Sequence, residues 1–406
     1  MSEARPLAAA PATPAPAPAD GGGAARAPRL IGALRRLRNR LAASPSVQAR
    51  LARAPLLRRR AAVEEAALMD LVAGFVHSQA LLALVELGLL ERLLDAPATA
   101  EAVAGEAGTG EAGTGEAGTG GAGALDPDRL EALLRAGAAL GLLEREGGGW
   151  RTSLRGAALL GAPGAVAMIR HHGALYADLA DPVALLRGRR DTALARVWPY
   201  VAGAPGAEAA ARYSELMALT QPPVAEATLR AARLGSARHL LDAGGGAGAF
   251  AIAAARAHPR LRVTVLDLPA VEAPARAAIE AAGLGGRVRF VAGDLRLALP
   301  RGADAISLVR VLYDHPDRTA RAILEAAFDA LPPGGRLVVS EPMSGGARPR
   351  RATDGYFALY CMAMGTGRLR SAAEIAALLR ASGFEAVRER RTGRPAVSSV
   401  VEARRR

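Results

Sequence analysis

Short apolar runs alternate with longer amphipathic segments throughout the second half of the chain. Runs rich in β-branched residues predict strands, and apolar residues at helical spacing predict helices. We expect strands over 239–243, 262–268, 287–293, 303–312 and 335–342. Helices are expected between and after them, over 247–258, 269–283, 317–330 and 371–382. This alternation predicts an α/β domain with an open, mostly parallel sheet and helices on both faces.

The pattern changes at the C-terminal end. Residues 384–404 read FEAVRERRTGRPAVSSVVEAR, which is two strand-like runs around a Thr-Gly turn. Two strands joined by a short turn run antiparallel. We therefore expect the domain formed by residues 236–406 to finish with an antiparallel hairpin.

The N-terminal half is predicted to be mostly helical. Residues 62–71 and 74–94 are rich in Leu, Val and Ala and predict two helices. No segment has the uninterrupted apolar length of a membrane-spanning helix. The best candidate, 69–94, contains charged and polar residues, so we expect an amphipathic core helix there.

A basic amphipathic helix is expected within residues 29–60, with arginines flanking an apolar face made of Leu30, Leu34, Leu37 and Leu41. Such a helix binds an anionic membrane surface, or it is a solvated helix that packs on the main body or on a partner subunit, and the pattern favours neither. The preceding Ala/Pro-rich tail, residues 1–28, is of low complexity and is expected to be disordered. It lacks the compact apolar core of a secretory signal.

Residues 61–160 predict a small helical domain, interrupted at 105–121 by a Gly-rich repeat that reads as a flexible insertion. A helix from Asp126, a Gly-rich turn and a short strand pair together resemble a winged helix. The helix carries Asp126, Asp128 and Glu131, whereas a surface that binds DNA phosphates should be cationic. A dimerisation module, and no nucleic-acid partner, is therefore expected. Residues 161–235 are expected to be a helical connector that lines a cleft.

Composition adds few constraints. The chain has 406 residues, enough for two domains and a tail, and a net charge of +13 in which every basic residue is an arginine. Cys361 is the only cysteine, which excludes an intramolecular disulfide and a cysteine-rich metal cluster. A reducing cytoplasm fits this cysteine content. No His/carboxylate cluster suggests a metal site, and none is expected.

The candidate chemistry begins at the end of the first strand of the large domain. A Gly-rich turn lets a ligand approach the backbone, and the following helix offers free N–H groups. The turn residues are Asp242, Gly244, Gly245, Gly246 and Gly248. An acid about 20 residues on is placed for a ribose hydroxyl pair.

Asp267 and Leu268 follow the second strand, and Gly293, Asp294 and Leu295 follow the third. Ligands bind at this edge of open α/β sheets, and an acid after the third strand suits the amine of an adenine. Asp267 as a helix cap and Asp294 as a turn residue are the structural alternatives. Their joint order at strand ends favours the cofactor reading.

Residues 61–404 resemble the two-domain S-adenosylmethionine-dependent O-methyltransferases. The carrying motifs are LLDAGGGAGAF (240–250), VLDLP (265–269), VAGDL (291–295), RVLYDHPD (310–317) and LPPGGRLVVSEP (331–342). The resemblance implies a class I methyltransferase fold, a Rossmann-like sheet with a terminal antiparallel hairpin, behind an N-terminal winged-helix dimerisation domain. It also implies that Gly244, Asp267, Asp294 and Leu295 contact S-adenosylmethionine, and we expect Arg310 to border the reactive end of the cofactor.

The resemblance also indicates catalytic residues. The family's His-Asp-Trp motif, whose His is the general base, is matched by Tyr313-Asp314-His315, and its first supporting acid by Glu341. A second acid is expected near Leu369 and is absent. We expect His315, or Tyr313 relayed to it, to accept the substrate proton, with Glu341 orienting the base. A helix N-cap is the structural alternative for His315.

Longer strings at 72–91, 171–188 and 341–375 are similar to the O-methyltransferases that act on demethylspheroidene and hydroxyneurosporene in purple bacteria. This implies an acyclic hydroxy-carotenoid substrate. A polyene needs an adaptable apolar lining, in which Met is suitable. The residues expected to contact substrate are His171, His172, Tyr213, Met217, Met343, Tyr356, Tyr360 and Met364.

The sequence therefore predicts a homodimeric methyltransferase of carotenoid biosynthesis. It is expected in the cytoplasm with a peripheral contact to the inner, photosynthetic membrane, because its substrate dissolves in the bilayer. An O-methyltransferase for a phenolic or polyketide hydroxyl is the alternative within the enzymes. A winged-helix DNA-binding regulator is the alternative of another class. A nicotinamide dehydrogenase is disfavoured by Gly293-Asp294 and by the terminal hairpin.

Overall fold

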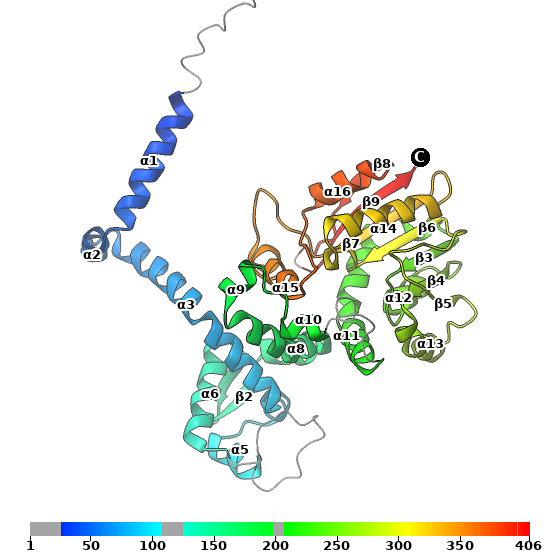
Figure 1. Cartoon of the computed structure of the whole chain (residues 1–406). Coiled ribbons are helices and arrows are strands. Elements are labelled where there is room, and N and C mark those ends of the chain that lie inside the picture. Colours follow the sequence, from blue (N-terminus) through cyan, green and yellow to red (C-terminus); the bar gives the residue numbers. More distant parts are fainter. Residues whose placement is uncertain (1–25, 108–124, 198–206, 396) are drawn as a thin grey trace, which may run out of the picture. The chain divides into compact units, whose positions relative to one another are not determined.

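The computed structural model describes residues 26–107, 125–197, 207–395 and 397–406 (Figure 1). Nearly all of the predicted tail and most of the Gly-rich insertion therefore lie outside the described residues. The chain divides into two compact units, Met1–Ser78 and Gln79–Arg406. Each unit is described by itself below.

The described part of the first unit consists of α1 (Arg26–Ala42), α2 (Pro45–Arg53) and the start of α3 (Arg58–Glu86). The expected apolar face of α1 is exposed, with Leu34, Leu37 and Leu41 all accessible. The predicted break before Gly74 is wrong, because α3 runs through it as one helix. No proline or cap interrupts the segment.

The prediction of a core helix over 69–94 is wrong for its N-terminal part. Met69, Val72 and Phe75 are exposed, Phe75 by 71%, and within α3 only Leu84 and Val85 are buried among the described side chains. By length and composition alone, α3 is also long and apolar enough to cross a membrane. Only 11% of its apolar 18-residue stretch is buried. Apolar residues are spread over all sides of α3, so the spacing of its apolar residues in the sequence does not identify a side that faces the core.

The second unit begins with a small helical domain. It contains α4 (Leu89–Arg92), α5 (Ala100–Ala107), α6 (Pro127–Ala139), β1 (Leu143–Glu146) and β2 (Gly149–Thr152). The Asp126 carboxylate caps α6 by accepting the Arg129 N–H at 3.0 Å. Gly147 and Gly148, both at positive φ, turn β1 back onto β2. The predicted helix and wing are therefore confirmed.

Glu131 of α6 ties the wing to the helix. Its carboxylate accepts the Trp150 indole N–H and an Arg145 N–H, each at 2.7 Å. The bond from Trp150, followed by one from Arg135, lowers the pKa of Glu131, and the charge of Arg145 adds to this. Glu131, one of the acidic residues that disfavoured DNA binding in the sequence, thus has a structural role in the small domain.

The connector is helical, as expected. It contains α8 (Pro163–Leu179), α9 (Pro182–Leu186), α10 (Ala193–Val197), α11 (Ala207–Ala231) and the short η1 (Leu234–Ser236), whereas α7 (Leu154–Leu160) precedes residue 161 and lies in the range predicted for the small domain.

The large domain has a seven-stranded sheet of order β5-β4-β3-β6-β7-β9-β8. Its strands are β3 (His239–Ala243), β4 (Arg262–Asp267), β5 (Val288–Ala292), β6 (Ala305–Val309), β7 (Arg336–Glu341), β8 (Phe384–Arg390) and β9 (Ser399–Arg405). The first five are parallel, whereas β9 lies antiparallel between β7 and β8. The predicted strands and the terminal hairpin are confirmed.

The intervening helical elements are α12 (Ala249–Ala257), η2 (Pro269–Val271), α13 (Glu272–Ala281), η3 (Leu312–Asp314), α14 (Asp317–Ala330), η4 (Arg351–Gly355), α15 (Phe357–Ala363) and α16 (Ala372–Ala381). Helices α14 and α16 pack on one face of the sheet, and α11, α12 and α13 on the other (Figure 1). Adjacent strand residues such as Leu240 and Leu241 belong to opposite cores because side chains alternate along a strand.

A chain of buried hydroxyl groups joins α11 to the sheet. The Thr228 hydroxyl donates to the Val224 carbonyl at 2.7 Å and lies 2.6 Å from the Ser340 hydroxyl of β7. The Ser340 hydroxyl lies 2.7 Å from that of Ser398. These contacts position the helix that covers the C-terminal edge of the strands.

Replacing Ser340 with Ala is expected to lower the unfolding temperature by a few degrees. The change leaves a buried polar chain incomplete, which costs about 1–2 kcal/mol. Ser382→Ala is the matched control, because the Ser382 hydroxyl is buried without a hydrogen-bond partner in the described structure. The control should leave the unfolding temperature unchanged or raise it. Equal losses in calorimetry of the two variants would contradict this account.

Candidate active site

The Gly-rich turn forms at the end of β3. Gly244, Gly246 and Gly248 all have positive φ, which other residues rarely adopt. The Gly246 N–H donates to the Asp267 carboxylate at 2.7 Å. Because β3 and β4 run parallel and in register, Asp267 ends beside this turn. The same carboxylate accepts the Leu268 N–H at 2.7 Å.

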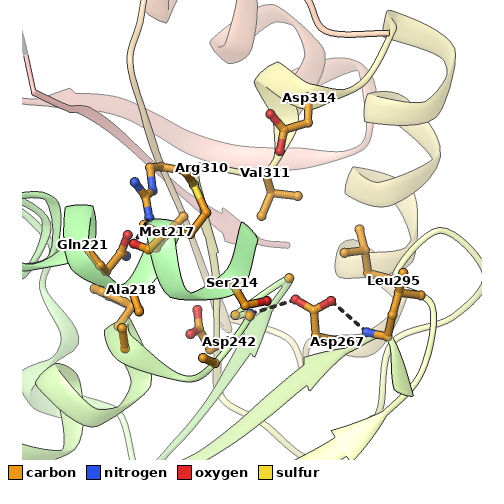
Figure 2. A pocket seen from close by; sticks show the side chains of 18 of the residues that line it. Ser214, Met217, Ala218, Gln221, Asp242, Asp267, Leu295, Arg310, Val311 and Asp314 are labelled. Atoms are coloured by element: carbon orange, nitrogen blue, oxygen red, sulfur yellow. Dashed lines mark hydrogen bonds between the residues drawn. The ribbon is translucent and has the colours of Figure 1, made fainter. Parts of the chain in front are cut away.

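A pocket opens above the C-terminal edge of the strands (Figure 2). Its empty volume, with the open side included, is about 910 Å³. All the residues predicted to bind the cofactor line it except Gly248, which caps α12 behind the turn. The lining residues not predicted as cofactor contacts include Ser214, Met217, Ala218 and Gln221 of α11 and Arg296, Val311, Asp314 and His315.

Buried acceptors without partners surround this pocket. Gln221 Oε1, Asp242 Oδ2 and Asp314 Oδ1 are buried and have no hydrogen-bond partner among the described residues. Burial raises the pKa of Asp242 to about 7, and the adjacent Asp267 adds to that rise, whereas the bond from Ser307 opposes it. Acceptors left unpaired at a pocket suit a cationic, hydroxyl-bearing ligand.

Arg296 and His315 lie at the side of the pocket that holds Asp294. The Asp294 carboxylate accepts Arg296 N–H groups, which lower its pKa. His315 is mostly buried, and burial followed by the charges of Arg296 and Arg370 lowers its pKa to about 4. His315 is therefore neutral at pH 7.

The turn η3 carries the Tyr313-Asp314-His315 triplet and is held by segment 366–370. Four of its carbonyl groups each accept one hydrogen bond from that segment. The two ends of the Arg370 guanidinium donate to the outer carbonyls, Nη1 to that of Leu312 at 2.8 Å and Nη2 to that of His315 at 2.7 Å. The Arg368 N–H donates to the Tyr313 carbonyl at 2.7 Å, and the Thr366 hydroxyl donates to the Asp314 carbonyl at 2.9 Å.

We call segment 366–370, with its hydrogen bonds to the carbonyls of residues 312–315, the η3 clamp. Arg370 and Glu341 make further contacts that hold the same turn. The Arg370 side chain is 0% exposed and also donates to the Asp317 carboxylate at the start of α14. Glu341, at the end of β7, accepts the Tyr313 N–H at 3.1 Å from the other side. Burial raises the pKa of Glu341 to about 7, against the opposing charge of Arg370.

Tyr313, the residue in the expected base position, is buried in a cluster with Leu194, Tyr360 and Met364. Its ring packs edge-on against Phe357, with centroids 6.2 Å apart. Burial raises the pKa of Tyr313 well above its usual value. Tyr313 is not among the residues that line the pocket.

The predicted substrate residues fall into four groups. His171 and His172 of α8 pair with the hydroxyls of Tyr360 and Tyr356, at 3.0 and 2.8 Å. Of the other predicted substrate residues, Met217 lines the pocket, while Met343 and Met364 are fully buried in apolar clusters. Tyr213 lies in α11, and its side chain is outside the described part of the structure.

The comparisons with known proteins agree with this geometry. The family model for the O-methyltransferase domain matches residues 176–385, and that for the O-methyltransferase dimerisation domain matches 69–160. The chain belongs to the O-methyltransferase family.

The similar proteins cover most of the chain. Demethylspheroidene O-methyltransferase of Cereibacter sphaeroides is 48% identical over 91% of this chain and 95% of its own length. The enzyme of the same name from Rhodobacter capsulatus is 44% identical, over 90% and 88%. The solved mitomycin 7-O-methyltransferase is 26% identical, with a TM-score of 0.69 over 86% of this chain and 99% of its own.

The family uses S-adenosylmethionine, and the chain is an S-adenosylmethionine-dependent O-methyltransferase. The pocket fits that cofactor because its unpaired acceptors suit a cation, and its turn glycines leave room that a side chain would fill. A Cβ added to Gly244 would lie 2.8 Å from Val311 Cγ2. Within the described ranges, no group of three or more His, Cys, Asp or Glu residues could hold a metal ion.

Replacing Gly244 with Ala is expected to weaken binding of S-adenosylhomocysteine by about tenfold or more, because positive φ is strained and the Cβ meets Val311. Gly283→Ala is the matched control. Gly283 has similar positive φ, but an added Cβ meets nothing within 4 Å. Calorimetric titration should show normal affinity for the control. Normal affinity in Gly244→Ala would argue against this cofactor site.

Proposed function

We propose that the enzyme methylates the tertiary 1-hydroxyl group of an acyclic carotenoid, such as demethylspheroidene or hydroxyneurosporene, in spheroidene or spirilloxanthin biosynthesis. The observation that supports this most is the extent of similarity to two enzymes named for demethylspheroidene. Both relatives align over about nine-tenths of this chain, helical connector included. Since the connector packs against α15 beside the pocket, the similarity extends over the region where an acceptor would bind.

The region beside the pocket suits a long apolar acceptor. Side chains of α8, α9, α10 and α15 form one apolar cluster around Tyr313 and Tyr360. The two His–Tyr pairs join α8 to α15, and the stacked rings of Tyr356 and Tyr360 lie 5.6 Å apart. We propose that the predicted substrate residues contact the polyene, His171 and His172 from α8, Tyr213 and Met217 from α11, and Tyr356, Tyr360 and Met364 from α15 and its two ends, with Met343 after β7.

When bound, S-adenosylmethionine supplies a methyl group on a cationic sulfur. The chain must hold a hydroxyl oxygen in line with that methyl group, because positioning of this kind supplies much of the rate. The predicted cofactor contacts, from Asp242 to Arg310, would fix one partner. Buried side chains around the clamped η3 turn exclude water, which favours a reaction that disperses charge.

The proton acceptor is a separate question. His315, or Tyr313 relayed to it with Glu341 as orienting acid, stays the prediction from the sequence. Glu341 is placed to hold the turn, since it binds the Tyr313 backbone. The domain division at residues 60, 160 and 235 likewise stays a prediction.

We propose that the enzyme is a homodimer in which the exposed apolar face of α3 is covered by a second copy. The dimerisation-domain match begins at residue 69, within the exposed stretch of that helix. A contiguous apolar face of this kind is unusual on a monomer.

We further propose a peripheral contact with an anionic membrane through α1 and α2, from the cytoplasmic side. Residues 26–60 contain eleven arginines and no Asp or Glu. Leu34, Leu37, Leu41 and Leu51 are exposed on these helices. An exposed apolar face bordered only by cations matches an anionic lipid surface.

Labelled S-adenosylmethionine should transfer its methyl group to a 1-hydroxy acyclic carotenoid presented in liposomes. Transfer to catechol should be slower by about a hundredfold, because a flat phenol cannot use the contacts made by a polyene. Product analysis by chromatography and mass spectrometry checks both acceptors. Equal rates on the two, or methylation of catechol alone, would sink the carotenoid proposal.

Full-length protein should co-sediment with vesicles that contain phosphatidylglycerol and be released by high salt. Replacing Arg35, Arg36, Arg38 and Arg40 with Gln should weaken binding at least about tenfold, since each arginine near an anionic surface contributes about 1 kcal/mol. The control replaces the exposed Arg256, Arg260, Arg301 and Arg321. Unchanged binding by the α1 variant would remove the proposal, and retention at high salt would indicate instead that α3 inserts.

A further inference from the structure

The acceptor of the substrate proton must reach the reacting oxygen, and neither predicted base meets this condition well. Tyr313 is buried in the apolar cluster and does not line the pocket. His315 does line the pocket, but its electrostatic partners are Asp294 and Arg296, at the side expected to hold adenine. A different group should therefore face the methyl end.

Asp314 meets the geometric condition. Its side chain is on the clamped η3 turn, it lines the pocket, and the residue is 7% exposed. Its Oδ1 atom is buried and without a hydrogen-bond partner in the described structure. In Figure 2 the Asp314 carboxyl group lies across the pocket from Asp242 and Asp267. An unpaired buried carboxyl oxygen at a ligand pocket is placed to pair with a ligand.

The clamp makes this position rigid. Because every carbonyl of residues 312–315 accepts a hydrogen bond from segment 366–370, the backbone that carries Asp314 cannot turn away from the pocket without breaking several of these bonds. A carboxyl group could otherwise turn toward solvent, where it is better hydrated. We infer that the turn is built to keep Asp314 facing the pocket.

We propose that Asp314, as the carboxylate, is the general base that accepts the hydroxyl proton in methyl transfer. This inference depends on the O-methyltransfer reaction of the family and not on the carotenoid as acceptor. Asp314 thus takes the role for which Tyr313 and His315 were predicted. Arg370 and Glu341 act as positioning residues through the turn.

The charges around Asp314 suit this role. Burial, followed by the nearby Glu341, raises the pKa of Asp314 well above its usual value, and Arg310 opposes the rise. The other titratable groups that interact with Asp314 are Tyr313 of its own turn and Tyr360 and Cys361 of α15. All three have raised pKa values and are neutral at pH 7. A carboxylate of raised pKa is a stronger base than one in water.

The step balances in atoms and charge. The hydroxyl oxygen forms the new O–CH3 bond while the S–CH3 bond breaks, and sulfur keeps that electron pair. The O–H proton passes to the Asp314 carboxylate late in the step. One cation and one anion become two neutral groups, so a dry site favours the reaction. The positive sulfonium also favours ionisation of Asp314 before the step.

Proton release on cofactor binding tests this without any acceptor. Calorimetric titrations in two buffers of different ionisation enthalpy give the number of protons released. S-adenosylmethionine should release more than S-adenosylhomocysteine, since only the former carries the sulfonium. Both carry the same amino acid group, so a response of Asp242 to that ammonium cancels in the comparison. Equal release by the two ligands in the unmodified enzyme overturns the proposal by itself.

Variants complete the test. Asp314→Asn should abolish the difference in proton release and lower kcat about a hundredfold or more, with cofactor affinity within about threefold. The rise of kcat/KM with pH should also disappear, because that rise reports ionisation of the base. Asp329→Asn, the same change at an exposed position of α14, should alter none of these. Loss of the pH limb in His315→Ala but not in Asp314→Asn would assign the base to His315.

Discussion

The buried guanidinium of Arg370 is the constraint on which the catalytic site depends. A buried charge is stable only when hydrogen-bonded, and Arg370 obtains its acceptors from the Leu312 and His315 carbonyls and the Asp317 carboxylate. The turn must therefore keep one shape for the cation to stay paired. Because Arg370 binds the carbonyls at both ends of the turn, it also holds the backbone of Asp314 and His315, which line the pocket.

Two pairs of acidic residues lie at or beside the pocket. Asp242 and Asp267 are predicted cofactor contacts, and Asp314 and Glu341 lie on and beside the η3 turn, where we propose that the acceptor binds. Burial raises the pKa of three of these acids, Asp242, Asp314 and Glu341. Asp242 and Asp314 line the pocket, so a cationic cofactor would lower that cost for both of them. In the mechanism proposed above, cofactor binding is thereby coupled to the ionisation of Asp314.

The sequence was sufficient for the sheet and for the cofactor edge, because strand period and Gly-rich turns are local signals. The position of Asp267 and Asp294 at the pocket was predictable, since parallel strands bring their ends to one edge, and their contacts with the cofactor stay a prediction. Asp314, Arg370 and Gln221 gave no such signal: their roles arise from η3, segment 366–370 and α11, which meet only in the fold. The burial of α3 was mispredicted because an apolar helix does not reveal what covers it.

The most direct measurement is a crystal structure of the enzyme with S-adenosylhomocysteine and a hydroxy-carotenoid. The account predicts the acceptor hydroxyl within about 2.6–3.2 Å of an Asp314 carboxyl oxygen, with the η3 clamp intact. It also predicts that the polyene follows the apolar cluster between α8 and α15. A hydroxyl bound instead to His315 or Tyr313, with Asp314 turned away, would contradict it.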